Sequence, residues 1–173
     1  MSHIKNILIN CSNIIRDNPY NNFRNTYNYI KNEKNILNIN KYKTIFENKE
    51  IIEINKLNYS KIKLCDSYIN KKFNYKLELY LIKWNPKSNS NIHSHLYHGC
   101  VMKILEGCLI ESIYNKDIIL KQNNNYKCHD TGFINNDIGY HKIFNNTNNY
   151  SYSLHLYCDI LNKHTEIKYF EAS

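Results

Sequence analysis

Apolar residues recur at helical spacing in the first third of the chain. Residues three or four positions apart lie on the same face of an α-helix, so this spacing predicts a mainly helical leader over residues 1–55. The segment Asp17-Asn18-Pro19 is expected to interrupt the leader, because proline disfavours the helical conformation of the residue before it. The positions that carry the spacing are Ile4, Leu8, Cys11, Ile15, Tyr27, Ile30, Ile45, Ile51 and Ile54.

After about residue 56 the apolar spacing changes to two, which is typical of β-strands with one better-buried face. The stretch YKLELYLIKW places Leu77, Leu79 and Leu81 on one such face. Further strands are expected in VMKILEGCLIESIY, as a pair around Glu106-Gly107, in TGFINND and in YSYSLHLYCDI. Short strands after a helical leader predict an α+β protein with a small antiparallel barrel or sandwich over about residues 56–173.

Length and composition narrow the picture only a little. A chain of 173 residues fits a single domain, which is expected to span residues 1–173. With 31 asparagines, asparagine loses much of its value as a turn signal. The net charge of +8 comes from basic residues spread along the chain without a basic block, which favours a solvated surface and leaves nucleic-acid binding a distant alternative.

The cysteines and the hydropathy bear on the compartment. The six cysteines form no C-x-x-C pair, so neither a zinc ribbon nor a thioredoxin-type site is indicated. No N-terminal signal with a long apolar core is visible, and no apolar run approaches the roughly 18 residues needed to span a bilayer. These features predict a cytoplasmic protein with mostly free thiols, and a monomer without membrane or nucleic-acid partners is expected.

The stretch NIHSHLYHGC, residues 91–100, concentrates the candidate chemistry. Residues two apart on a strand point to the same side, so His93 and His95 are expected to project together. A lone histidine on an apolar face is more often a hydrogen-bonded core residue, but the paired spacing favours a metal site. His141, which follows a glycine-bearing turn in NDIGYHKIFNN, is the candidate third ligand.

These motifs resemble a known family. The order His93-x-His95, Cys100, Gly107, then Gly139-x-His141 and Asn145, resembles the two metal motifs of the cupin superfamily. A cysteine stands where most cupins carry a glutamate ligand, and this resembles the cysteine dioxygenase branch. Trp84 before the first ligand, MKILEGCLIESIY, FINNDIGYHKI and SYSLHLY are also similar to that family. The resemblance implies a cupin-type (jelly-roll) β-barrel after the helices.

The resemblance also implies an activity. It implies an iron(II)-dependent dioxygenase that oxidises L-cysteine with O2 to cysteine sulfinic acid, with His93, His95 and His141 as Fe(2+) ligands. Three neutral ligands leave the ion its full charge, which favours a thiolate substrate. In the family, the residues matching Cys100 and Tyr157 form a thioether crosslink. From the sequence alone, Cys100 could equally be a small apolar filler, since free cysteine is among the most buried residue types.

The last predicted strand carries a row of polar residues. Ser153, His155 and Tyr157 alternate with leucines, so one face can pass a hydrogen bond from a surface-side serine to the phenol. On the strand alone, a buried tyrosine with His155 as its hydrogen-bond partner is the more ordinary reading. The resemblance favours catalytic roles for these residues.

The chain departs from the family pattern at the substrate carboxylate. The family binds that carboxylate with an arginine in a Tyr-x-Arg setting, whereas both arginines of this chain, Arg16 and Arg24, lie in the leader. The nearest counterpart is Tyr59 with Lys61, and lysine lacks the planar two-pronged hydrogen bonding of arginine. The alternatives are therefore a thiol dioxygenase for cysteamine, 3-mercaptopropionate or an N-terminal peptide cysteine, or a non-catalytic metal-binding cupin module.

Overall fold

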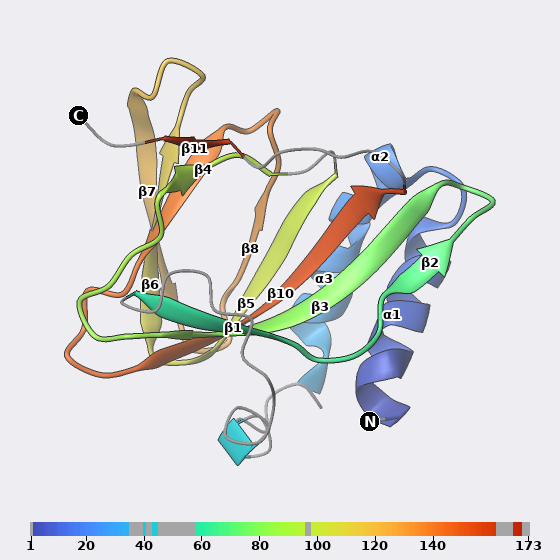
Figure 1. Cartoon of the computed structure of the whole chain (residues 1–173), viewed down its shortest axis with the longest axis horizontal. Coiled ribbons are helices and arrows are strands. Elements are labelled where there is room, and N and C mark those ends of the chain that lie inside the picture. Colours follow the sequence, from blue (N-terminus) through green and yellow to red (C-terminus); the bar gives the residue numbers. More distant parts are fainter. Residues whose placement is uncertain are drawn as a thin grey trace.

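The leader is helical where the structure describes it. The computed structural model describes residues 2–34, 40, 43–44, 58–95, 98–161 and 168–170 (Figure 1). Helix α1 (Ser2–Ile15) ends before the predicted break, and α2 (Pro19–Asn22) begins at the proline. A short 3-10 turn, η1 (Phe23–Asn25), leads into α3 (Thr26–Asn32). The predicted helical positions Ile45, Ile51 and Ile54 lie outside the described residues.

Antiparallel strands form two sheets. The six-stranded sheet has the order β1-β3-β10-β5-β8, with β2 paired to β3, and the five-stranded sheet has the order β11-β4-β9-β6-β7. The strands are β1 (Tyr59–Lys63), β2 (Tyr68–Asn70), β3 (Tyr75–Trp84), β4 (Ile92–His93), β5 (Gly99–Glu106), β6 (Cys108–Tyr114), β7 (Leu120–Lys127), β8 (Thr131–Ile134), β9 (Tyr140–Phe144), β10 (Ser151–Ile160) and β11 (Tyr169–Phe170). All the strands predicted from alternating apolar residues are present.

The arrangement confirms the α+β class and refines the predicted barrel. Trp84, Ile82 and Met102 of the first sheet pack against Leu109 and Ile143 of the second, so the sheets face each other across an apolar layer. Within the described ranges no strand ladder joins the two sheets, so their strands form a two-sheet sandwich rather than a closed barrel. A sandwich and a closed barrel give the same period-two alternation along each strand, because the alternation reports only which face of a strand is buried. The sequence pattern therefore could not distinguish the two.

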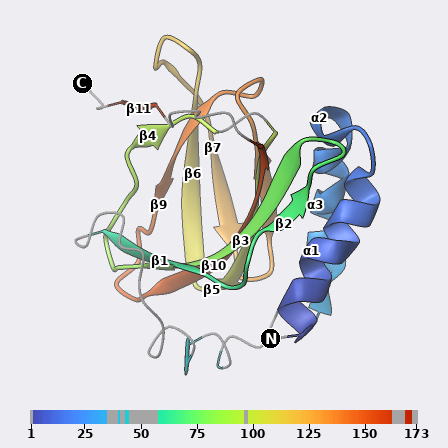
Figure 2. The same ribbon diagram turned by 45° about the vertical axis from the view of Figure 1, so that its right-hand side comes forward.

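The leucine face of β3 turns outward to the helices. Leu77, Leu79 and Leu81 are fully buried in one cluster with Ile7 and Leu156. Figure 2 shows α1 and α3 lying along this side of the six-stranded sheet. Each leucine side chain buried there contributes about 1.5–3 kcal/mol. The helices therefore cover one face of the sheet and leave its other face for the space between the sheets.

No helix among the described residues is long and apolar enough to cross a membrane. All six cysteines lie among the described residues, and none of them forms a disulfide there.

Candidate metal centre

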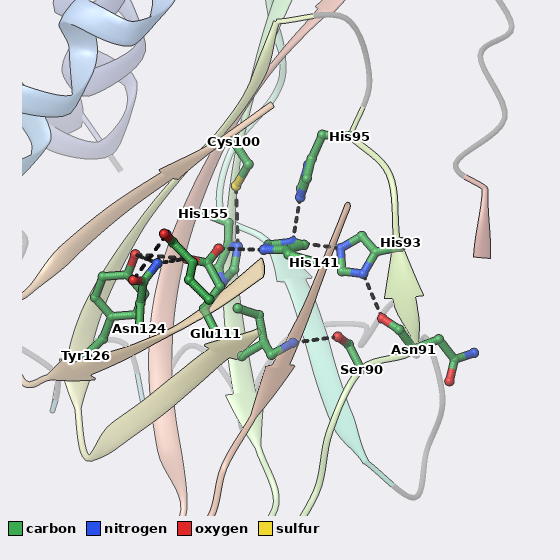
Figure 3. Close-up of polar contacts among 12 residues, drawn as sticks. Ser90, Asn91, His93, His95, Cys100, Glu111, Asn124, Tyr126, His141 and His155 are labelled. Atoms are coloured by element: carbon green, nitrogen blue, oxygen red, sulfur yellow. Dashed lines mark hydrogen bonds and ion pairs between the residues drawn. The ribbon is translucent and has the colours of Figure 1, made fainter. Parts of the chain in front are cut away.

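The three predicted ligand histidines meet between the sheets. His93 on β4 pairs directly with His141 on β9, so backbone register alone places the two residues side by side. His95 follows β4, and its backbone N–H donates to Asn136 Oδ1 at 2.8 Å. The Nε2 atom of His141 lies 2.7 Å from that of His95 and 3.1 Å from that of His93 (Figure 3). All three imidazoles offer a ligand atom within 4.8 Å of the others.

The turn before His141 requires its glycine. Gly139 has a φ of +151°, and a Cβ there would stand 2.2 Å from the Tyr114 carbonyl oxygen. Any other residue would push β9 away from β6, and His141 would move with it. The glycine noted in the sequence therefore sets the position of the third imidazole.

Hydrogen bonds to the far side of two rings fix their tautomers. His93 Nδ1 donates to the Asn91 carbonyl oxygen at 2.9 Å, and His141 Nδ1 donates to Glu111 Oε1 at 2.7 Å. Because a carbonyl and an ionised carboxylate only accept, both Nδ1 atoms carry a proton, and in the neutral form of each ring Nε2 presents its lone pair. Two lone pairs at close range repel each other unless a cation lies between them. The three-histidine group therefore fits a metal ion.

The rings of His93 and His95 are held neutral, as metal ligation requires. Burial, reinforced by the neighbouring His141, lowers the pKa of His93 to about 3. Burial also holds the pKa of His95 well below its usual range. A metal ion would therefore meet unprotonated imidazole nitrogens here.

Glu111 is a site residue that the sequence analysis missed. It lies on β6 between Leu109 and Ile113, on the face that points between the sheets, and is 2% exposed. Burial acts to raise the pKa of its carboxyl, but hydrogen bonds from His141, Asn124 and Tyr126 outweigh burial and hold that pKa below its usual range. The signal was present in CLIESIY, where a charged residue occupies a core position of an alternating strand.

A second hydrogen-bonded chain runs along β10. Trp84 Nε1 donates to Ser153 Oγ at 2.8 Å, and Ser153 Oγ lies 2.8 Å from His155 Nε2. Since indole N–H can only donate, the serine accepts from Trp84, and its own hydroxyl proton is available to be donated to His155 Nε2. His155 then carries its proton on Nδ1, which lies 3.5 Å from Cys100 Sγ.

This chain differs from the predicted one at both ends. Ser153 is fully buried rather than on the surface side, because its face of β10 points into the layer between the two sheets, where its ladder partner Ile82 also lies. Among the described hydrogen bonds, the last link from His155 reaches the sulfur of Cys100 rather than the hydroxyl of Tyr157. Cys100 is thus in contact with the polar chain as well as buried.

Cys100 and Tyr157 are neighbours across strands. They are paired residues in the β5–β10 ladder. The Tyr157 ring stacks on His155 with centroids 6.0 Å apart, and on His95 with centroids 5.9 Å apart. Burial raises the pKa of the Cys100 thiol and holds the pKa of Tyr157 well above its usual range. The protein therefore holds a neutral thiol and a neutral phenol next to the three histidines.

A small pocket of about 50 Å³ opens onto these groups. Its lining residues are Tyr59, Lys61, Ile82, Trp84, Ser90, His93, His95, His141, Ile143, His155, Tyr157 and Tyr169. The sequence analysis missed Tyr169, which pairs with His93 through β11 and β4. The apolar part of its lining strengthens any charge interaction inside it.

Lys61 is the one lysine among the pocket-lining residues, which include no arginine. Its Nζ lies 4.0 Å from the ring centroid of Tyr80 and 4.3 Å from that of Tyr157. Burial lowers the pKa of Lys61 to about 8. Tyr59 stands beside it in the pocket, with its ring 4.8 Å from that of Trp84. Tyr59 and Lys61, the two predicted substrate-binding residues, thus line the same pocket as the three histidines.

Comparison with known folds supports the architecture. Two solved structures of oxalate decarboxylase, one of them of the Bacillus subtilis enzyme, superpose with a TM-score of 0.53 at 15% and 16% identity. Each match covers 70% of this chain and 30% of the other chain. At such identities the likeness shows the fold alone.

Comparison of sequences is more specific. Cysteine dioxygenase type 1 of Rattus norvegicus and that of Mus musculus are each 30% identical over 91 residues, which is 49% of this chain and 46% of theirs. The aligned part thus spans about half the length of these curated relatives. The family model for cysteine dioxygenase type I matches residues 28–171, a range that includes both strands bearing the histidines and the whole pocket. The chain therefore belongs to the cysteine dioxygenase type I family.

Proposed function

We propose that this protein is an iron(II)-dependent thiol dioxygenase that converts L-cysteine and O2 to cysteine sulfinic acid. The observation that carries the proposal is the convergence of three imidazoles in a small pocket that is also lined by the lysine Lys61 and the partly buried phenol of Tyr157. His93, His95 and His141 would hold the metal. Iron would supply the electron chemistry that O2 needs, and the protein binds and orients the reacting molecules.

The pocket residues suit a small amino acid thiol. Lys61 is placed to neutralise the substrate carboxylate as a point charge, and the aromatic rings on either side of it limit where that carboxylate can sit. Tyr59 closes the same wall of the pocket. The apolar lining excludes water, which strengthens the attraction between carboxylate and ammonium.

Cys100 and Tyr157 are proposed to form the thioether of the family. The sulfur would bond to a ring carbon of Tyr157 with loss of one hydrogen from each residue, and O2 would accept the two electrons. The Trp84–Ser153–His155 chain supports this step, because a proton on His155 Nδ1 can stabilise the sulfur as it loses its own. The crosslink would fix the phenol beside the bound thiol.

The remaining features of the proposal concern the whole protein. Free cysteines favour a reducing compartment such as the cytoplasm. A monomeric, single-domain enzyme with no nucleic-acid or membrane partner is part of the same proposal. Light scattering of the purified protein would test the monomeric state. Its retention on immobilised nucleic acid at low salt would test whether it binds nucleic acid.

A thiol substrate panel tests the activity. Protein loaded anaerobically with Fe(2+) is mixed with cysteine, cysteamine, 3-mercaptopropionate or a peptide with N-terminal cysteine, and O2 uptake is measured after air is admitted. We expect cysteine to be the best substrate and His141→Ala to abolish its oxidation. His129→Ala, which changes an exposed histidine, is the matched control and should keep full activity.

The other outcomes identify the alternatives. Faster oxidation of cysteamine or of the peptide than of cysteine would identify that thiol as the substrate instead. Neither has a free carboxylate next to the thiol-bearing unit, so neither needs a cation to bind one. Zinc or no metal in the protein as isolated, without oxidation of any thiol after iron loading, would identify a non-catalytic binding module. Full activity in His141→Ala would refute the site.

A further inference from the structure

Both carboxylate oxygens of Glu111 accept hydrogen bonds from neighbouring side chains. Oε1 accepts from His141 Nδ1 at 2.7 Å, and Oε2 accepts from Tyr126 Oη at 2.9 Å and from Asn124 Nδ2 at 3.0 Å. The carboxylate is 2% exposed, so it cannot exchange these partners for water. Its orientation is therefore set by the three side chains around it.

Two of those partners come from β7, the edge strand of its sheet. Asn124 and Tyr126 are two residues apart, so they share the face of β7 that points between the sheets, and Glu111 is the ladder partner of Asn124 (Figure 3). Gly132 of β8 leaves room for the phenol, because a Cβ there would lie 2.7 Å from Tyr126 Oη. Tyr126 also borders a surface depression with Tyr27 of α3, so the hydrogen-bonded chain begins where solvent reaches it.

We propose that Tyr126 and Asn124 clamp Glu111, and that Glu111 through this clamp positions His141 for metal binding. A carboxylate that receives the Nδ1 proton of a ligand histidine fixes its tautomer, turns its ring and makes Nε2 a stronger donor to the metal. The polar, asparagine-rich strand β7 is thus a positioning element of the centre, although it lines none of the pocket. The inference rests on the proposed metal site but not on any particular thiol reaction.

Cobalt(II) binding tests the clamp without turnover. Metal-free protein is titrated with Co(2+), and binding is followed by the visible absorption of the bound ion and by competition with a chelator. We expect Glu111→Gln to weaken Co(2+) binding by about 10-fold to 100-fold, since the neutral amide no longer pulls the His141 proton. Tyr126→Phe, which removes one hydroxyl, should weaken binding by a few-fold, and the absorption band should shift in both variants.

Ser112→Ala is the matched control. Ser112 occupies the next rung of the same β6–β7 ladder, and its hydroxyl donates to Asn123 Oδ1 at 2.7 Å on the opposite face. This variant therefore also loses one hydroxyl that links the two strands, but not one that reaches Glu111. It should bind Co(2+) as the unaltered protein does.

A double variant tests whether Tyr126 acts through Glu111. If it does, Tyr126→Phe combined with Glu111→Gln should bind Co(2+) no more weakly than Glu111→Gln alone, whereas independent effects would add. Unchanged binding in Tyr126→Phe, additive losses, or an equal loss in Ser112→Ala would overturn the clamp. Should Glu111→Gln not fold, the comparison of Tyr126→Phe with Ser112→Ala decides the question. Normal Co(2+) binding without oxidation of any thiol would refute the proposed activity and leave the clamp standing.

Discussion

If the proposed function is right, the positive charge of Lys61 is the residue-level property that decides which thiol is the substrate. Burial against the rings of Tyr80 and Tyr157 lowers the pKa of its amino group to about 8, from an ordinary value near 10.4. The ammonium form therefore prevails below about pH 8 and is lost as pH rises through it. A thiol that carries a carboxylate should therefore bind more weakly once Lys61 is neutral, and this change falls within the usual pH range of enzyme assays.

We expect kcat/KM for cysteine to fall as pH rises through about 8, because kcat/KM reports the ionisation of the free enzyme. Steady-state O2 uptake between pH 6 and about 9.5 measures it. Lys61→Arg should remove this fall, since a guanidinium stays charged. Lys61→Met should lower kcat/KM for cysteine by about 10-fold to 100-fold and leave that for cysteamine nearly unchanged. A fall that persists in Lys61→Arg would assign the ionisation to another group.

At the scale of elements, the end of α3 is held by a side chain from the sheet. Lys103 on β5 is 1% exposed, and its ammonium donates to the carbonyl oxygens of Ile30, Lys31 and Glu33 at 2.8, 2.9 and 3.2 Å. The last carbonyls of a helix lack partners within the helix, and a cation there also interacts favourably with the helix dipole. The lysine therefore fastens the leader to the outer face of the six-stranded sheet.

Lys103→Met should reduce the free energy of unfolding by about 1–3 kcal/mol, because it leaves buried carbonyl groups without a donor. Urea denaturation followed by far-ultraviolet circular dichroism measures the change. Lys5→Met, which alters an exposed lysine on α1, should change the unfolding free energy by less than about 0.5 kcal/mol. Equal stability of the two variants would contradict the capping role.

Strand β7 shows how pairing overrides local preference. The segment LKQNNNYK has no apolar alternation and is rich in asparagine, which is depleted in strands, so the sequence analysis did not predict it. Its backbone nevertheless pairs with β6 from Cys108↔Lys127 to Tyr114↔Leu120, with one register shift that leaves out Lys121. An exposed edge strand needs no apolar face, and hydrogen bonds to its neighbour are enough to form it.

At the scale of the molecule, the helices and the sandwich share one core. Ile4, Ile7 and Leu8 of α1 belong to the same buried cluster as Leu79 and Leu156 of the six-stranded sheet. Without the leader, a leucine-rich sheet face would be exposed to water at a cost of about 25 cal/mol for each Å². The helical and β parts should therefore be stable only together.

We expect one cooperative unfolding transition. The chain has a single tryptophan, Trp84, which lies in the pocket between the sheets, so its fluorescence reports the site while far-ultraviolet circular dichroism also reports the helices. The two signals should give the same midpoint in a thermal or urea titration. A helical signal lost at clearly lower denaturant than the fluorescence change would show that the leader is a separate unit.

The sequence by itself determined the local elements and the kind of chemistry. Alternating leucines predicted β3 within the correct bounds, and His93 and His95 were found because the spacing of candidate ligands along a strand is a local property. His141 was found from its glycine-bearing turn and from the resemblance to the family motif. The sequence also located Tyr59 and Lys61, and the structure places both in the pocket. Secondary-structure propensity and apolar spacing depend on residues that are close in sequence, so both can be predicted from the sequence alone.

Only the tertiary structure decided what each strand face packs against, how the two sheets are arranged and which residues support the three histidines. The leucine face of β3 packs on helices about 70 residues earlier in the chain, and Glu111 meets His141 through the pairing of β6 with β9. Tyr169 reaches the pocket by pairing with His93, far away in sequence. Contacts of this kind depend on strand order and register, and alternation along one strand carries no information about which strand becomes its neighbour.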